Sequence, residues 1–280
     1  MEKQDIFFFS LLITFWALNY PLIKLALNYM HPFYLTFFRL LFTLPFLAIL
    51  IPHGFKPLKG IKKNLEVLIF GALGVLGTWT LWYLGENYIS SSLAAIIMYT
   101  YPIITIVLAA AFIREKLGLV RLTGALLGFI GIVFILYEQI FVTNPIGILL
   151  VFLSSISWSI SIIFYKRTLS GENYATVNTY QMIYALPLSA ILLLFNSPPS
   201  HLPLSFWMII LLLSFPGTAV TFTIYVYMYS KYSVNRITAY LFLVPAISVL
   251  FSYVIFRTEF TPLEIMGFAL VICGIYMASR

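Results

Sequence analysis

Charged side chains are scarce in this sequence. Of its 280 residues, 9% are Asp, Glu, Lys or Arg, whereas a soluble domain has about 25%. Hydrophobic residues make up 62% of the chain and the mean hydropathy is +1.01. A chain this poor in charge cannot cover its apolar surface in water. The sequence therefore predicts an integral membrane protein rather than a soluble one.

Long polar segments are also missing. Short polar breaks separate apolar runs that reach the length of about 20 residues needed to cross a bilayer. The runs do not alternate polar and apolar residues, as the strands of a membrane barrel do, so we expect an all-α membrane protein with ten transmembrane helices. The predicted helices lie near 6–27, 33–51, 65–84, 92–112, 119–137, 146–165, 175–195, 206–228, 236–256 and 262–279.

The sequence has one cysteine and no recognisable signal for cleavage of a leader. The single cysteine, Cys273, excludes an intrachain disulfide. The first residues, Met1 to Asp5, are barely basic, and no small-x-small cleavage site follows the first apolar run. That run is therefore predicted to be a retained helix rather than a signal peptide.

Positive charge is nearly absent from one side of the predicted topology. With the N-terminus inside, 13 of the 16 Lys and Arg residues fall on inner segments, Arg257 alone falls on an outer loop, and Lys24 and Arg39 lie within runs. Cytoplasmic loops carry such an excess. We expect a multi-pass protein of the cell (inner or plasma) membrane with both termini cytoplasmic. The net charge of +7 then reflects topology, so nucleic acid is not an expected partner.

The two halves of the chain resemble each other. The stretch "FWALNYPLIK" at 15–24 aligns with "SWSISIIFYK" at 157–166. The offset is 142 residues at first and 143 further on; it pairs Trp16 with Trp158, Lys24 with Lys166, Pro45 with Pro187, Pro102 with Pro245, Arg114 with Arg257, Gly124 with Gly267 and Gly131 with Gly274. We predict two five-helix repeats, 1–140 and 141–280. Because five is odd, the second repeat enters the membrane from the opposite side, and such inverted repeats are typical of secondary transporters.

Several segments carry a family resemblance. "TFWALNYPLIKLAL", "FFRLLFTLPFLAIL" and "YTYPIITIVLAAAFIREKLGLVRLTGALLGFIGIVFIL" resemble the segments of an EamA repeat, and "YLFLVPAISVLFSYVIFRTEFTPLEIMGFALVICGIYMASR" resembles the close of a second one. The resemblance implies the ten-helix branch of the drug/metabolite transporter superfamily, whose members export amino acids, nucleosides, drugs or other small metabolites. One departure is that the family's Gly-Glu pair reads Arg114-Glu115 here and Thr258-Glu259 in the second half.

The first predicted helix contains polar residues that should avoid lipid. Trp16, Asn19 and Tyr20 share one helix face, and Pro21 frees a carbonyl and can kink the helix. An exposed amide in hydrocarbon costs several kcal/mol, so this face should meet protein or a cavity. The residues form either a cavity wall or, through Asn19, an interhelical hydrogen bond. Lys24 lies close enough to the helix end to snorkel to the membrane surface, with a substrate contact as the alternative.

Arg39 lies about two turns inside the second predicted helix, where a charge costs at least about 2.5–3.5 kcal/mol. Its repeat equivalent is Gln181, so the duplication does not require the charge. Its guanidinium could bind a substrate carboxylate or phosphate. The alternative is a structural role, with bonds to backbone carbonyls or to Glu86.

Aromatic and hydroxyl side chains recur along the third, fourth, eighth and ninth predicted helices. Such residues suit a pocket for a small amphipathic solute, although those near helix ends (Trp82, Tyr83 and Tyr229) also fit an interfacial belt. Glycines 124, 128 and 131 are expected to allow close helix packing. The candidate substrate-binding residues are Trp16, Asn19, Tyr20, Arg39, Trp79, Tyr99, Trp158, Thr221, Tyr225 and Thr238.

Acids and histidines are missing from the middle of the predicted helices. All nine acids and all three histidines fall in loops or at helix ends, so a buried carboxylate proton relay, a metal site and a catalytic centre have no obvious residues. Glycine signatures for nucleotides are absent too, and no cofactor is expected. We predict a non-enzymatic secondary transporter that exports a small metabolite such as an amino acid by alternating access; an intramembrane enzyme or a scaffold is the alternative. The expected partners are a small-molecule substrate and the lipid bilayer, with a homodimer left open.

Overall fold

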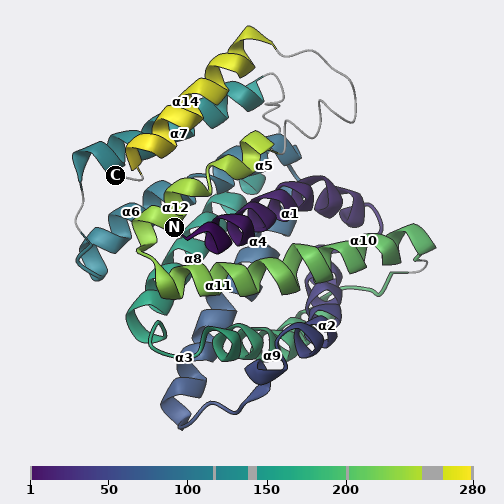
Figure 1. Ribbon diagram of the computed structural model, residues 1–280. Helices are drawn as coiled ribbons and strands as arrows, with labels where there is room; N and C mark the ends of the chain where they lie inside the picture. The colour runs from purple at the N-terminus through teal and green to yellow at the C-terminus, as the bar shows by residue number, and fades with distance from the viewer. Residues whose placement is uncertain (1, 116–117, 138–143, 200–201, 248–260, 279–280) are drawn as a thin grey trace.

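The computed structural model describes residues 2–115, 118–137, 144–199, 202–247 and 261–278. These ranges are helical and contain no strand (Figure 1), which confirms the all-α prediction. The helices are α1 (Lys3–Leu27), α2 (Pro32–Leu50), η1 (Pro52–Phe55), α3 (Ile61–Gly71), η2 (Ala72–Gly77), α4 (Thr78–Glu86), α5 (Ser91–Met98), α6 (Tyr101–Phe112), α7 (Leu119–Leu136), α8 (Pro145–Thr168), α9 (Tyr174–Leu192), η4 (Leu193–Phe195), α10 (Leu204–Ser214), η5 (Phe215–Val220), α11 (Thr221–Lys231), α12 (Val234–Tyr240) and α14 (Pro262–Ala278).

Eight continuous or nearly continuous helices in the described ranges are long and apolar enough to cross a bilayer. Two further apolar helices, Val234–Ile247 and Pro262–Ala278, are shorter. The ninth predicted run, 236–256, extends into residues outside the described ranges. The chain is thus a multi-pass membrane protein, as predicted, and eight of its ten predicted spans coincide with helices of spanning length. The eight are Lys3–Leu27, Pro32–Leu50, Ile61–Glu86, Leu93–Phe112, Leu119–Leu136, Pro145–Thr168, Tyr174–Phe195 and Leu204–Lys231.

Side chains before the helices fix where several of them begin. Asn173 Oδ1 accepts from the backbone N–H groups of Ala175 and Thr176 at the start of α9. Asn144 Oδ1 accepts from Ile146 N at the start of α8, whose first residue is a proline. These bonds satisfy N–H groups that have no partner within the helix. The polar breaks between apolar runs therefore act as helix caps.

Two π-helical segments interrupt the helices at equivalent places in the two repeats. The segment η2 joins α3 to α4, and η5 joins α10 to α11, with an offset of 143 residues. A threonine hydroxyl bonds a carbonyl five residues earlier at each segment, from Thr78 to Leu73 O in η2 at 2.9 Å and from Thr218 in η5 to Leu213 O at the end of α10 at 2.7 Å. Such single-turn π segments are frequent at functional sites. The sequence pattern did not predict them.

Two helix breaks are also equivalent. Residues 99–100 form a turn between α5 and α6, and residues 241–242 form a turn after α12, before the helix resumes at 243. Pro102 and Pro245 follow these turns. A proline removes one backbone N–H and disfavours the helical conformation in the residue before it. The paired prolines of the repeats thus account for both discontinuities.

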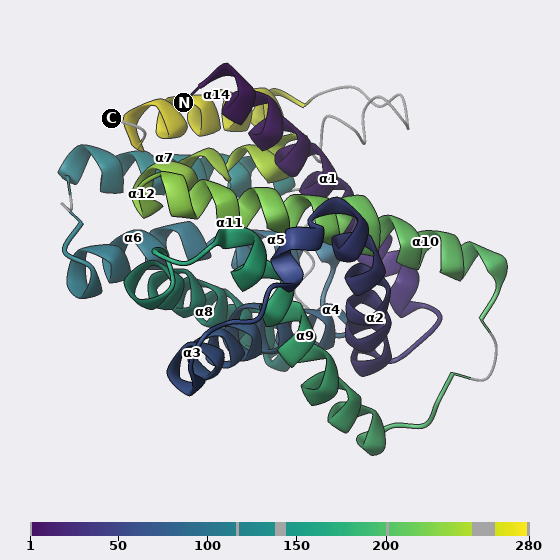
Figure 2. The same ribbon diagram turned by 60° about the horizontal axis from the view of Figure 1, so that its bottom comes forward.

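The contacts between helices are preserved when each helix is replaced by its equivalent in the other repeat. Helix α4 packs on α8, and its equivalent α11 packs on α1; likewise α3 packs on α9, and α10 on α2. The pair α7 and α14 lies side by side at one edge of the bundle in both views (Figures 1 and 2). This exchange is the arrangement expected of two halves related by a pseudo-two-fold axis.

The start of α1 and the end of α14 lie on the same side of the bundle in both views (Figures 1 and 2). We call this side the N face and the opposite side the far face. On the N face, Asp5 accepts from Lys231 Nζ at 2.9 Å and from the hydroxyls of Tyr227 and Tyr232, which joins α1 to the end of α11. On the far face, α1 ends close to the end of α4, which is described below.

Candidate functional site

A cavity of about 50 Å³ lies between α1, α2, α4, the α5–α6 break, α8 and α11. Its size suffices for water, whereas pockets that enclose small-molecule ligands have about 300–1,000 Å³. Seven of the ten candidate residues line it. The lining residues are Trp16, Asn19, Tyr20, Arg39, Thr78, Trp79, Trp82, Met98, Tyr99, Tyr101, Trp158 and Phe222.

The α1 face predicted to avoid lipid meets both the cavity and the second repeat. Asn19 Nδ2 donates to the carbonyl of Gly217 in η5 at 3.1 Å. Tyr20 packs against the rings of Trp82 and Tyr99, with centroids 4.9 and 6.2 Å away. Both interpretations of this face therefore hold at once, because Asn19 makes an interhelical hydrogen bond and also lines the cavity.

Arg39 of α2 is the one charged residue among the described cavity-lining residues, and it is only 1% exposed. Its Nε donates to Thr218 Oγ1 at 2.7 Å, one terminal nitrogen to Tyr83 Oη at 2.6 Å, and the other to Gly217 O at 3.0 Å. The guanidinium also lies 4.3 Å from the ring centre of Trp79. All of these partners are neutral. The positive charge is thus held firmly without a carboxylate bonded to it in the described part of the chain.

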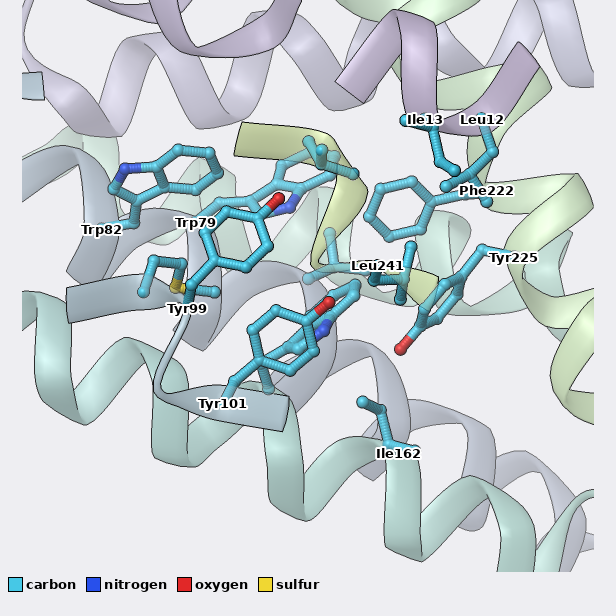
Figure 3. Packing of buried hydrophobic residues seen from close by; sticks show 14 of the residues in the cluster. Leu12, Ile13, Trp79, Trp82, Tyr99, Tyr101, Ile162, Phe222, Tyr225 and Leu241 are labelled. Carbon is cyan, nitrogen blue, oxygen red and sulfur yellow. The ribbon is translucent and has the colours of Figure 1, made fainter. Parts of the chain in front are cut away.

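Aromatic rings fill the centre of the molecule (Figure 3). Trp16 of α1 and Trp158 of α8, which are equivalent in the repeats, meet edge to face at 6.0 Å. Phe222 contacts both of these rings and also Trp79, at 5.4 to 5.9 Å. The equivalent tryptophans thus meet across the boundary between the two repeats. Trp16, Trp79, Trp158 and Phe222 are called the central aromatic residues below.

Three candidate residues lie outside the cavity lining. Tyr225 packs behind it, 5.3 Å from Trp16 and 5.0 Å from Trp158. Thr221 donates to Gly217 O at 2.8 Å, and Thr238 shares a hydrogen bond with Tyr229 at 2.8 Å. All three residues are buried.

Sequence reasoning missed several lining residues. Trp82 and Tyr83 lie near a helix end, and we considered an interfacial belt for them, yet both are buried and Tyr83 hydrogen-bonds to Arg39. The repeat offset could have found Trp82, because it pairs Trp82 with Tyr225. The same offset could have found Thr78, which it pairs with Thr221. Met98 and Tyr101 gave no such signal, since only the helix break turns them toward the cavity.

The far-face end of α1 is joined to the end of α4. The Nζ of Lys24, which is expected to snorkel, donates to the backbone carbonyl of Glu86 at 2.9 Å. Glu86 ends α4, as predicted for an acid at a helix end, and its side chain is fully buried. Within the described ranges, no three His, Cys, Asp or Glu side chains come close enough to hold a metal ion.

Some polar atoms at the cavity have no hydrogen-bond partner among the described residues. These are Asn19 Oδ1, Trp82 Nε1 and Tyr101 Oη. Buried polar groups in proteins are normally paired. The cavity therefore offers one free acceptor, one free donor and one hydroxyl beside a cation and several aromatic faces.

Comparison with known proteins identifies relatives over the whole chain. An uncharacterized transporter of Archaeoglobus fulgidus is 30% identical over 278 residues, which cover 97% of each chain. A probable amino-acid metabolite efflux pump of Salmonella typhimurium is 24% identical, covering 99% of this chain and 95% of its own. One crystal structure, 19% identical, matches with a TM-score of 0.82 over 100% of this chain and 97% of that one, which shows a shared fold.

The pattern of one transporter family matches the chain twice, over residues 4–137 and 145–280. The two matches agree with the paired prolines, π segments and helix breaks. The relatives are named as transporters, in agreement with the expectation that the chain is not an enzyme. The chain belongs to the EamA-like transporter family.

Proposed function

We propose that this transporter exports a small amphipathic solute that carries a carboxylate, with an amino acid as the simplest case. The buried guanidinium of Arg39 in an aromatic cavity is the observation that supports it. A charge at this depth costs several kcal/mol, and such residues generally mark substrate pathways. A carboxylate from the solute would neutralise the charge.

The geometry of Arg39 leaves room for this role. Arginine has five N–H donors, and three of them are used by Thr218, Tyr83 and Gly217. These bonds orient the fork that binds carboxylates in a bidentate manner. Because the cavity is small, binding of a solute requires the surrounding helices to separate, as in alternating access between two repeats.

The remainder of an amino acid also finds complementary groups. Among the described residues that line the cavity none is acidic. The faces of Tyr20, Trp79 and Tyr99 can attract an ammonium group, and Asn19 Oδ1 can accept a hydrogen bond from it. The name of the Salmonella relative, a probable amino-acid metabolite efflux pump, supports the same substrate class.

Transport by purified protein in liposomes tests the proposal. A panel of labelled amino acids, nucleosides and organic cations is offered, and each transported amino acid is competed with its own amide, which lacks the carboxylate. We expect the acid to compete at least tenfold better than the amide, the discrimination given by one charge-assisted pair. Equal competition by acid and amide would contradict a carboxylate site.

Variants at Arg39 give the second readout. Arg39→Gln should abolish transport of the amino acid, and Arg39→Lys should retain part of it, because the charge stays but the fork is lost. Arg167→Gln, at an exposed position at the end of α8, is the control for removal of a positive charge. Monodisperse elution in detergent shows that each variant folds. If Arg39→Gln folds and transports normally, Arg39 has a structural role only.

We also propose that the N face is cytoplasmic, which makes efflux the movement from the N face to the far face. The excess of Lys and Arg on N-face segments supports this orientation. In a Cys273→Ser background, the variants Gly171→Cys on the N face and Asn28→Cys on the far face report the orientation of the protein in the membrane of intact cells. An impermeant thiol reagent should label position 28 and spare position 171. Preloaded liposomes then show the direction of net transport.

A further inference from the structure

The residues that line the cavity have equivalents in the other repeat, and the equivalents of three of them are buried together with their neighbours. The repeat offset carries the lining residues Asn19, Thr78 and Trp82 onto Ser161, Thr221 and Tyr225. All three counterparts are buried, and Ser161 and Tyr225 follow Trp158 and Phe222 along α8 and α11 in the direction of the N face, where both helices end. Because Trp16 pairs with Trp158 and Trp79 with Phe222, the exchange maps the central aromatic residues onto themselves. The two sets of lining residues therefore share one aromatic centre.

Hydroxyl and amide groups continue from these counterparts toward the N face. The ring of Tyr225 lies 4.7 Å from that of Tyr229, whose hydroxyl shares a hydrogen bond with Thr238. Asn235 lies one turn before Thr238 on the same face of α12. Its side chain is 1% exposed, and neither of its polar side-chain atoms has a hydrogen-bond partner among the described residues. An unpartnered buried amide at such a place calls for a ligand or for a second arrangement of the helices.

On each face of the molecule a lysine joins two helices, and the two lysines are equivalent in the repeats. On the far face, Lys24 of α1 donates to the carbonyl of Glu86 at the end of α4. On the N face, Lys166 of α8 donates to the carbonyls of Tyr229 and Tyr232 at the end of α11, at 2.9 Å each. The offset that pairs Lys24 with Lys166 also pairs Glu86 with Tyr229. Both lysines therefore tie equivalent helices together, and both ties are made in this structure.

Resting on the proposed function, we propose that the chain has a second half-site for the transported solute, on the N-face side of the central aromatic residues, which Lys166 holds shut. Lys24 performs the same task for the cavity on the far face. When the Lys166 ties break, α8 and α11 separate and expose the hydroxyls of Tyr225, Tyr229 and Thr238 together with the Asn235 amide. The far-face tie stays made in that conformation.

The chemistry of the second half-site differs from that of the first. Gln181 stands where Arg39 stands in the first repeat, and its amide nitrogen donates to Asn178 Oδ1 at 2.8 Å. The second half-site thus holds the polar groups of the solute by neutral hydrogen bonds, whereas the first pairs a carboxylate with a cation. The solute loses its ion pair whenever the protein opens to the N face.

Thiol accessibility tests the proposal without requiring a known substrate. In a Cys273→Ser background, Thr238→Cys reports the N-face half-site and Ala95→Cys, its repeat equivalent, reports the far side; both native side chains are buried. The probe is a trimethylammonium methanethiosulfonate reagent applied to protein in detergent. Lys166→Gln loses two charge-assisted hydrogen bonds and should raise the modification rate at 238 by at least about tenfold. It should also lower the rate at 95. Lys24→Gln should do the reverse.

Each outcome of this experiment supports or overturns the proposal. Lys166→Arg keeps the hydrogen-bond donors, so the cysteine at 238 should be modified at close to the rate of the parent protein. This variant separates loss of the Lys166 hydrogen bonds from general damage to the fold. A rate at 238 that is unchanged in Lys166→Gln overturns the proposal, and so does a rise at both reporters, which would mean loosening of the whole bundle. If the rates shift as expected but no amino acid is transported, the half-site stands and the proposed substrate is wrong.

Discussion

Replacement of Gly217 by alanine tests how tightly the cavity wall is built. A Cβ atom at Gly217 would overlap Asn19 Oδ1 and lie 3.1 Å from the carbonyl of Leu212. The Gly217 carbonyl also accepts hydrogen bonds from Asn19, Arg39 and Thr221. We expect Gly217→Ala to displace the Asn19 amide, because a side-chain amide can move and the carbonyl held by three donors cannot.

The expected magnitude follows from two losses. A hydrogen bond between membrane helices contributes about 0.6 kcal/mol on average, and one extra methyl group in a packed interior costs about 1–3 kcal/mol. Gly217→Ala should therefore lower the free energy of unfolding by about 1.6–3.6 kcal/mol. If Asn19 is first replaced by alanine, the clash and the bond are already gone. The same Gly217→Ala change should then cost at least about 0.5 kcal/mol less.

Reversible unfolding in mixed micelles, driven by increasing SDS, measures these free energies. Gly171→Ala is the matched control, because a Cβ atom there would have no neighbour within 4 Å. The wild type, both single variants and the double variant complete a mutant cycle. The packing argument is refuted if Gly217→Ala is no more destabilising than Gly171→Ala, or if the effects of Asn19→Ala and Gly217→Ala simply add.

Three further changes have defined outcomes. Arg114 has a φ of 55°, in the left-handed region that costs a non-glycine residue about 1 kcal/mol. Arg114→Gly should therefore raise the melting temperature of the protein, and Arg114→Val should lower it. Equal melting temperatures for the wild type and both variants would contradict this. The Glu115 carboxylate accepts hydrogen bonds from the backbone N–H groups of Val234 and Asn235, at 2.9 and 3.2 Å. Glu115→Ala should lower the free energy of unfolding by about 0.5–2 kcal/mol and speed hydrogen exchange in the first turn of α12. Unchanged exchange would show that the cap is dispensable. Gly131→Ala would place a Cβ atom 2.6 Å from the carbonyl of Gly267; it should destabilise the protein by about 1–3 kcal/mol, measured by the same SDS titration with Gly171→Ala as control.

The sequence predicted features that depend on composition or on the duplication. Apolar runs and their breaks give the helices, since backbone groups in lipid must be satisfied within a helix. The repeat offset predicted that Trp16 and Trp158 are equivalent, and the structure adds that they touch. The backbone conformation of Arg114 also explains the glycine of the family's Gly-Glu pair, because glycine is the residue best suited to a positive φ.

Other features could not be predicted because they depend on the third dimension. No local sequence pattern reveals that η2 and η5 are π-helical, with more residues per turn than an α-helix. The π-helical turn of η5 places the Gly217 carbonyl where it accepts a hydrogen bond from Arg39. The position of Trp82 near a helix end suggested a membrane interface, yet its neighbours bury it. The partners of Arg39 come from α4 and η5, far away in sequence, so the spacing of residues around position 39 contains no information about them.

The contacts between α7 and α14 have an evolutionary consequence. A Cβ atom on Gly124 would meet the Gly274 carbonyl at 2.7 Å, and one on Gly131 would meet the Gly267 carbonyl at 2.6 Å. Because Gly124 is equivalent to Gly267 and Gly131 to Gly274, the first contact becomes the second when the repeats are exchanged. Each half thus presents a surface that is complementary to itself, as in a symmetric dimer. An ancestor of half this length could have paired with an inverted copy through these same glycines, and gene fusion would then have preserved an interface that already existed.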